Sequence, residues 1–228
     1  MKILLWDIDG TLMKTDRAGL YAFQEAISDI LHTDICFESI KTAGMTDCYI
    51  AEQIISLVKG REATANEIAE LIKRYQEVLP SHLAERKGTL MPNILEILEH
   101  FHNRSDVISL LLTGNTAFGA EAKVKRYGIA HYFNFAASAF GDKCADRNQL
   151  AANALTNITE YYTNLTSPRL FVIGDTPNDV RCGKHINANT IAVATGGYSL
   201  EDLIEHSPWW AVKSLPSPQI FEAKLMTI

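Results

Sequence analysis

Hydrophobic and polar residues follow one periodicity in the segment 14–86 and another in the rest of the chain. Within 14–86, apolar residues recur every three or four positions, which is the spacing of one face of an α-helix. The pattern predicts helices over 17–31, 46–60 and 64–88, and Pro80 is expected to kink or break the third. A segment that is helical almost throughout indicates an all-α insert.

Outside this segment, short apolar runs alternate with amphipathic stretches of helical spacing. The runs lack the polar alternation of a half-exposed sheet, so they indicate a parallel sheet with both faces covered. We expect strands over 2–6, 106–115, 132–140, 169–175, 189–197 and 209–215, and helices over 93–103, 117–128, 147–164, 177–187 and 199–206. The predicted fold is therefore α/β: a Rossmann-like, doubly wound parallel sheet formed by 1–13 and 87–228, with an all-α cap at 14–86.

Acidic and hydroxyl side chains follow the expected strands where these strands end. Asp7 and Asp9 follow the first strand, Thr113 ends the second, and Asp175 follows a later one with Asp179 four residues on. Because open parallel sheets bind ligands beyond the carboxyl ends of their strands, we expect these side chains to meet. Carboxylates that lie close together repel one another unless a cation is present, and oxygen ligands without His or Cys suit Mg²⁺.

The turns beside these carboxylates contain glycine and hydroxyl groups, which suit a phosphoryl group together with backbone N–H groups at helix starts. We expect Gly10 and Thr11 after the first strand, and Gly114 and Asn115 after the second, to bind phosphate. One carboxylate can attack phosphorus and form an aspartyl-phosphate, while a second protonates the leaving oxygen and later activates water. The residues themselves do not say which of the two leading aspartates takes which role.

Several segments resemble the motifs of the haloacid dehalogenase-like superfamily, in its phosphatase branch. "DIDGTL" at 7–12 resembles the first motif, "LLLTGN" at 110–115 the second and "VIGDTPNDV" at 172–180 the fourth, and they occur in the same order. The helical insert follows the first motif, where that superfamily has its type-1 cap. "AGMTDCYI" at 43–50 is similar to a stretch of phosphoglycolate phosphatase-like relatives.

The resemblance implies a role for each matching position. Asp7 would be the nucleophile and Asp9 the general acid and base, while Thr113 would donate a hydrogen bond to the phosphoryl group. Asp7, the backbone carbonyl of Asp9, and Asp175 would hold Mg²⁺, and Asp179 would support the metal shell. The cap would close over the site and exclude water.

The third motif departs from the family pattern, because "FGDKCADRNQL" lacks the Lys-Pro pair of many relatives. Lys143 and Arg147 compete as the cation of this motif, and the shorter separation from Asp175 favours Arg147, whose guanidinium can clamp phosphate through two hydrogen bonds. Lys143 can equally be a solvated loop residue. In the cap, the resemblance brings Thr46 and Asp47 toward the site, although both can simply start a helix.

Composition and charge narrow the possible partners. The chain has 228 residues, is 47% hydrophobic and has a formal net charge of -6. It has no Lys/Arg cluster for nucleic-acid phosphates and no run approaching the about 18 apolar residues of a membrane helix. The N-terminus does not have the pattern of a signal peptide. Four cysteines without paired spacing, at 36, 48, 144 and 182, favour a cytoplasmic protein.

These observations predict a Mg²⁺-dependent phosphomonoesterase that acts on a small phosphorylated metabolite through an aspartyl-phosphate, with phosphoglycolate-like compounds or sugar phosphates as candidates. A sugar phosphate mutase on the same scaffold is an alternative, since it would return the phosphoryl group to its substrate. A phosphate-accepting or phosphate-binding module without enzymatic activity is another. The sequence does not specify the oligomeric state.

Overall fold

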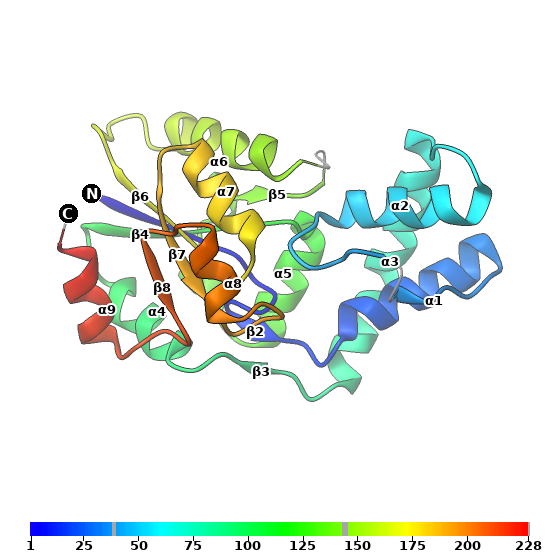
Figure 1. Ribbon diagram of the computed structural model, residues 1–228, viewed down its shortest axis with the longest axis horizontal. Coiled ribbons are helices and arrows are strands. Elements are labelled where there is room, and N and C mark those ends of the chain that lie inside the picture. Colours follow the sequence, from blue (N-terminus) through cyan, green and yellow to red (C-terminus); the bar gives the residue numbers. More distant parts are fainter. Residues whose placement is uncertain (38–39, 143–145, 228) are drawn as a thin grey trace.

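Six parallel strands form the central sheet of the computed structural model, which describes residues 1–37, 40–142 and 146–227 (Figure 1). In spatial order they are β5 (Ala139–Phe140), β4 (Val107–Thr113), β1 (Lys2–Trp6), β6 (Arg169–Gly174), β7 (Asn189–Val193) and β8 (Trp210–Val212). β1 therefore lies inside the sheet, between β4 and β6. The polar residues that follow these three strands are brought together at one edge of the sheet.

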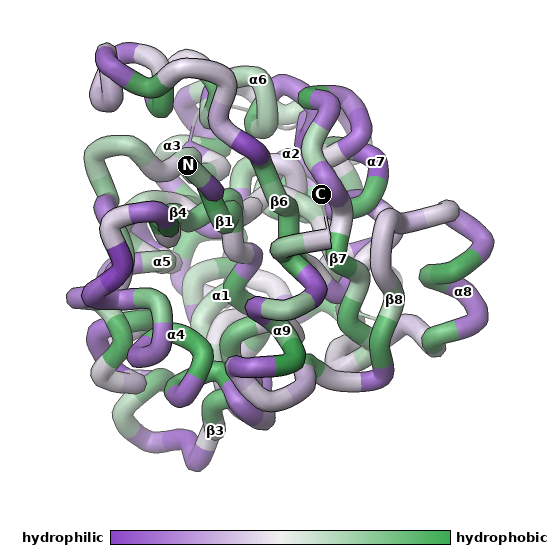
Figure 2. Tube along the Cα trace, turned by 90° about the vertical axis from the view of Figure 1, so that its left-hand side faces the viewer, coloured by the Kyte–Doolittle hydropathy of each residue, from purple (hydrophilic) through white to green (hydrophobic). Residues whose placement is uncertain are grey.

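Helices cover both faces of this sheet. One face packs against α4 (Ile94–His102), α5 (Ala117–Arg126) and α9 (Pro218–Leu225), and the other against α6 (Arg147–Tyr161) and α7 (Pro177–His185). Alternate residues of β1 enter the two cores, because successive side chains of a strand point to opposite faces. Figure 2 shows the hydrophobic colouring of β1, β6 and β7 in the interior. The predicted α/β, doubly wound sheet is confirmed.

Three further helices lie beside the sheet and are called the cap: α1 (Ala18–Leu31), α2 (Asp47–Lys59) and α3 (Ala65–Glu85) (Figure 1). They pack around their own hydrophobic cluster, in which the rings of Phe23 and Tyr75 stack at 4.0 Å between centroids. A short antiparallel ribbon of β2 (Met13–Lys14) and β3 (Thr89–Leu90) connects them to the sheet. All three lie within the expected insert, while the domain boundaries stay a prediction.

The expectation that Pro80 kinks or breaks the third cap helix is wrong in one respect, because α3 continues past it to Glu85. Pro80 removes one backbone hydrogen bond, but Leu79 before it and Leu83 after it are both buried in the cap. Packing on both sides of the proline holds the helix together against that loss. Within the part of the chain that the structure describes, no helix is both long and apolar enough to cross a membrane.

Two segments near the ends of the sheet differ from the prediction. The expected strand 132–140 is mostly irregular: it contains the 3₁₀ turns η2 (Ala130–Tyr132) and η3 (Phe135–Ala137), and only β5 pairs with β4. Asn134 caps the second turn by accepting a hydrogen bond from the N–H of Ala136, which competes with strand pairing. The sequence did not predict α9, whereas the short α8 (Leu200–Glu205) lies within its expected range 199–206.

Candidate active site

Asp7 is the residue at which β1 ends, and its neighbours in the sheet fix its position. Its N–H donates to the carbonyl oxygen of Ile173 on β6 at 3.0 Å. On the other side, Thr113 at the end of β4 lies near the Asp7 carboxyl group and lowers its pKa, while the Thr113 hydroxyl accepts hydrogen bonds from the N–H and Nδ2 of Asn115. Both side chains are buried. The Asp7 carboxyl group is therefore held between the ends of two strands that are distant in sequence.

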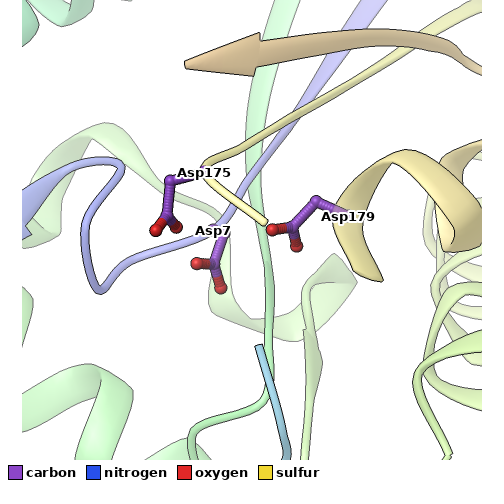
Figure 3. Close-up of side chains that lie close together, drawn as sticks. All are labelled: Asp7, Asp175 and Asp179. Atoms are coloured by element: carbon purple, nitrogen blue, oxygen red, sulfur yellow. The ribbon is translucent and has the colours of Figure 1, made fainter. Parts of the chain in front are cut away.

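Three carboxyl groups, from the ends of β1 and β6 and from the first turn of α7, form a buried cluster. One oxygen from each of Asp7, Asp175 and Asp179 lies within 4.8 Å of the others (Figure 3). Burial raises the pKa of Asp7, although Arg147 opposes the shift. Burial, with the charge of Asp7, raises the pKa of Asp175 to about 8. The cluster thus disfavours its own full ionisation, and a small divalent cation with a preference for oxygen ligands, such as Mg²⁺, fits it.

Arg147 supplies a cation beside this cluster. It is the first residue of α6, which Asp146 caps by accepting from the N–H of Asn148 at 3.0 Å. Its Nη2 pairs with Asp179 and its Nη1 lies 3.6 Å from Asp7 Oδ1. Its buried Nε has no hydrogen-bond partner among the residues described. Of the two candidate cations, Arg147 therefore lies at the cluster, with its Nε–H available to a ligand, whereas Lys143 lies outside the described residues.

Asp179 is occupied on both of its carboxylate oxygens. Oδ2 accepts from the N–H of Thr176 at 3.0 Å and from its hydroxyl at 2.7 Å, which forms a capping box at the start of α7. Oδ1 accepts from Arg147. Asp179 is thus both a helix-capping acid and a support for the cluster. It orients Arg147 and the turn that carries Asp175, and it leaves Asp7 and Asp175 as the carboxylates with more room for a metal.

Asp9 lies apart from the cluster and has a cation of its own. Its Oδ2 accepts from Lys123 Nζ at 2.5 Å and from Asn115 Nδ2 at 2.8 Å, and the same Nζ also donates to Asn115 Oδ1 at 2.6 Å. The Lys123 side chain is 4% exposed, but that of Asp9 is 47% exposed. The Asp9 carboxylate is therefore fixed on one side and open on the other.

Sequence reasoning missed Lys123, which lies on α5. One signal was present in the sequence. Ala120 and Val124 lie on the buried face of α5, and Lys123 shares this face. Helical periodicity predicts an apolar residue at such a position, so a lysine there is unusual. A buried lysine needs a partner. No local motif identifies that partner as Asp9, because the two residues are 114 positions apart.

Phosphate binding by the N–H groups of Gly10 and Thr11 stays a prediction, and both groups have partners within their own turn in this structure. The Gly10 N–H donates to Met13 and the Thr11 N–H to Ile8, so the turn closes on itself. The Thr11 hydroxyl instead donates to Asp175 Oδ1 at 3.2 Å. Gly10 has a φ of +81°, and a Cβ there would lie 2.5 Å from Asp175 Oδ2. Both residues therefore position Asp175.

The loop after β4 joins the cap to the sheet through Asp47. The Asp47 N–H donates to the carbonyl oxygen of Gly114 at 2.8 Å, and its Oδ2 accepts from the N–H of Thr116 at 2.9 Å. Burial raises the pKa of Asp47 to about 6, while Lys123 opposes the shift. Thr46 is fully buried and caps α2 by accepting from Tyr49 at 3.1 Å, so it is not available to a substrate.

These groups line one cavity of about 490 Å³ between the strand ends and the cap. This volume is within the ~300–1,000 Å³ of small-molecule sites. Its wall on the sheet side contains acidic and cationic groups, namely Asp7, Asp9, Lys123, Arg147 and Asp175, together with Thr113, Gly114 and Asn115. Its wall on the cap side is mainly apolar, with Leu20, Phe23, Met45, Ile50 and Tyr75, although Asp47 also reaches it. The cavity suits a ligand with an anionic end and a less polar end.

Comparison with known proteins points to one family. Residues 4–184 match the sequence model of the haloacid dehalogenase-like hydrolases. A phosphoglycolate phosphatase from Aliivibrio fischeri is 23% identical over 219 residues, which cover 91% of this chain and 90% of the relative.

Solved structures share the fold over nearly the whole chain. A HAD hydrolase of family IA, variant 3, from Entamoeba histolytica superposes with a TM-score of 0.73 at 13% identity, covering 97% of this chain and 98% of its own. A Bacteroides vulgatus protein provisionally named a β-phosphoglucomutase gives 0.70 at 17% identity, covering 99% and 88%. A hydrolase from Pseudomonas syringae gives 0.70 at 18% identity, covering 100% and 99%.

Proposed function

Because the chain belongs to the haloacid dehalogenase-like hydrolase family, as an enzyme of the phosphatase type, we propose that it is a Mg²⁺-dependent phosphomonoesterase acting on a small phosphorylated metabolite. The observation that carries this proposal is the buried Asp7 carboxyl group, which lies beside Asp175 and Arg147 on the wall of a cavity under the cap. The cysteine pattern of the sequence supports a cytoplasmic location.

The residues can divide the reaction between them. A carboxylate oxygen of Asp7 attacks phosphorus, and the bond from phosphorus to the ester oxygen breaks, which leaves an aspartyl-phosphate. Asp9 opens onto the cavity, so it can give a proton to the leaving oxygen and then take one from the water that hydrolyses the intermediate. Arg147 has its unpartnered Nε for the phosphoryl oxygens.

Asp7 and Asp175 are the residues that would hold Mg²⁺, with Asp179 fixing their surroundings. When bound, the ion supplies positive charge that offsets the carboxylates and the phosphoryl oxygens. Thr113 lies near Asp7, so its hydroxyl can help to orient the attacking oxygen. Gly114 and Asn115 border the same space, and Asn115 in addition holds Asp9.

A test of the function is phosphate release from a panel that includes p-nitrophenyl phosphate, 2-phosphoglycolate and several sugar phosphates, each with MgCl₂ and with EDTA. We expect release that depends on MgCl₂. Isomerised sugar phosphate without inorganic phosphate would indicate a mutase instead. A stable phosphoprotein without turnover would indicate a phosphate-accepting module, and no reaction with any ester would contradict the proposal.

Lys123→Met is expected to lower kcat at least about tenfold, because acid–base catalysis contributes ~10²–10⁴-fold and Asp9 would lose its closest partner. Steady-state kinetics with p-nitrophenyl phosphate measures the effect. The matched control is Lys125→Met on the same helix, whose side chain is 65% exposed and whose ion-pair partner among the described residues is Glu121. An exposed pair of this kind contributes little, so we expect kcat to stay within about twofold. Wild-type kcat in Lys123→Met would show that Asp9 does not need this lysine.

A further inference from the structure

The cap contributes the hydroxyl group of Tyr75 to the cavity, and the proposed reaction does not use this group. Tyr75, on α3, is 1% exposed and lines the cavity, and its ring stacks on Phe23. Across the described residues, no hydrogen-bond partner is found for its hydroxyl group. The hydroxyl group does not belong to the fully enclosed polar atoms without a partner, so it reaches the cavity. A ligand in the cavity can therefore accept a hydrogen bond from it.

A second donor points to the same space, beside Gly19 on α1. A Cβ atom at Gly19 would lie 3.6 Å from Tyr75 Oη and 3.8 Å from Lys123 Nζ. Lys123 has three ammonium protons, and its hydrogen bonds to Asp9 and Asn115 take two of them. The absence of a side chain at Gly19 thus leaves a small space at which a phenol and an ammonium group converge. Gly19, Tyr75 and Lys123 are called the Gly19 corner.

Both polar groups of the Gly19 corner act as donors. Burial raises the pKa of Tyr75 well above its ordinary value of 10.0, and the charges of Asp47 and Asp9 add to the shift. The phenol therefore keeps its proton at any working pH, and Lys123 Nζ donates to Asp9 at 2.5 Å. A ligand in this corner must present an acceptor oxygen.

The surrounding charges favour a neutral oxygen over a carboxylate. Asp9 already pairs with Lys123, and the negative charges of Asp9 and Asp47 both act on the Tyr75 hydroxyl. Besides Lys123 and Arg147, the cations among the described lining residues are Lys14 on β2 and Arg17 just before α1, and both are exposed at the cavity margin. The Arg17 guanidinium lies 5.8 Å from the centre of the Tyr21 ring, which is not part of this cavity wall. A second anion would therefore meet negative charge without a cation of its own.

We propose that the Gly19 corner binds a neutral hydroxyl or carbonyl oxygen of the substrate's organic part, so that the enzyme prefers phosphomonoesters of neutral, hydroxylated carbon chains to those that carry a carboxylate. The inference rests on the proposed function, because the phosphoryl group at Asp7 places the organic part under the cap. Phe23 and Ile50 supply apolar wall for its carbon atoms. Tyr75 is then a specificity-determining residue, and it takes no part in the chemical step.

Three esters of equal carbon number test the preference: glycerol 1-phosphate, n-propyl phosphate and 3-phosphoglycerate. We expect the wild-type kcat/KM to be at least about tenfold higher for glycerol 1-phosphate than for either of the others. In Tyr75→Phe, the ratio of glycerol 1-phosphate to propyl phosphate should fall about tenfold, since only the donor oxygen is lost. Propyl phosphate serves as the internal reference, because it offers no acceptor beyond its phosphate.

Gly19→Ala tests the same corner without removing a donor. The added methyl group is at ordinary contact distance from both polar atoms, so it fits, but it fills the space for the ligand oxygen. We expect the same ratio to fall. The matched control is Tyr49→Phe, a half-buried tyrosine on α2 outside the cavity wall as the structure describes it, which should leave the ratio unchanged.

The outcomes separate the inference from the function. If wild-type protein hydrolyses the esters but the ratio is the same in Tyr75→Phe and Gly19→Ala, the Gly19 corner is not a substrate site, while the phosphatase activity stands. A higher kcat/KM for 3-phosphoglycerate than for glycerol 1-phosphate would overturn the preference for a neutral oxygen. Absence of phosphate release from every ester would instead refute the proposed function.

Discussion

Asp7→Asn is expected to lower phosphate release from p-nitrophenyl phosphate by at least about 10³-fold, because the amide cannot form the aspartyl-phosphate. The fold should survive the change. Asp7 is a buried carboxyl group whose pKa is raised by burial, so asparagine removes a charge that the folded protein accommodates poorly. Thermal unfolding in EDTA should therefore show a midpoint no lower than that of the wild type, which separates loss of chemistry from loss of structure.

Asp16→Asn is the matched control for this change in charge. Asp16 lines the margin of the same cavity, is exposed, and has a φ of +51°, a left-handed conformation that asparagine also tolerates. It should keep turnover within about twofold, as exposed substitutions usually do. Near-wild-type turnover in Asp7→Asn would refute Asp7 as nucleophile. Mass spectrometry of the acid-quenched wild-type enzyme, searched for phosphate on the peptide that contains Asp7, tests the intermediate directly.

The site residues that the sequence predicted are those whose position depends only on where a strand ends. Asp7, Thr113 and Asp175 each end or follow an apolar run, and in a parallel sheet the carboxyl ends of neighbouring strands share one edge. Their convergence follows from topology, without knowledge of any side-chain contact. Arg147 required more, since its place depends on where α6 begins beside the sheet.

The parts that the sequence did not predict depend on contacts across the chain. Lys123 lies on a helix, and its partner Asp9 follows a distant strand. In the sequence, Tyr75 cannot be distinguished from the other residues of the buried face of its helix. The N–H groups of Gly10 and Thr11 donate hydrogen bonds within their own turn, and the residue types alone do not predict these bonds. Helical periodicity gives the buried face of a helix, but not which cavity that face borders.

Contacts across the chain also explain why Asp7 and Asp9 have different surroundings. They are two residues apart, and the sequence gives them equal standing as carboxylates. In the structure, Asp7 is buried among other carboxyl groups, whereas Asp9 pairs with Lys123 and opens onto the cavity. The position of Asp7, in a cluster of carboxyl groups that can hold a metal ion, suits attack on phosphorus. The position of Asp9, open to the cavity, suits proton transfer to a leaving oxygen. Geometry thus supports the division of roles that the family resemblance implied.

Metal-free protein is expected to be less stable at pH 8 than at pH 5.5. The folded-state pKa of Asp175 is about 8, against an ordinary value of 3.8, so between these values the folded protein holds a proton that the unfolded chain has lost. Stability then falls as the pH rises through this window. From a pKa shift of this size, the loss between pH 5.5 and 8 is on the order of 3 kcal/mol, and the raised pKa of Asp7 acts in the same direction.

Mg²⁺ should reverse this trend, because it binds the ionised carboxylates of Asp7 and Asp175 and competes with their protons. Thermal unfolding followed by circular dichroism, with EDTA and with MgCl₂ at both pH values, should show a stabilisation by MgCl₂ that is larger at pH 8. Asp175→Asn is the matched variant: in EDTA it should unfold with a weaker pH dependence than the wild type, and MgCl₂ should stabilise it less. Since histidines and other acids titrate in both proteins, the difference between them isolates the cluster. Equal stabilisation by MgCl₂ in the two proteins would place the metal elsewhere, and a metal-free wild type that is more stable at pH 8 would contradict the raised pKa.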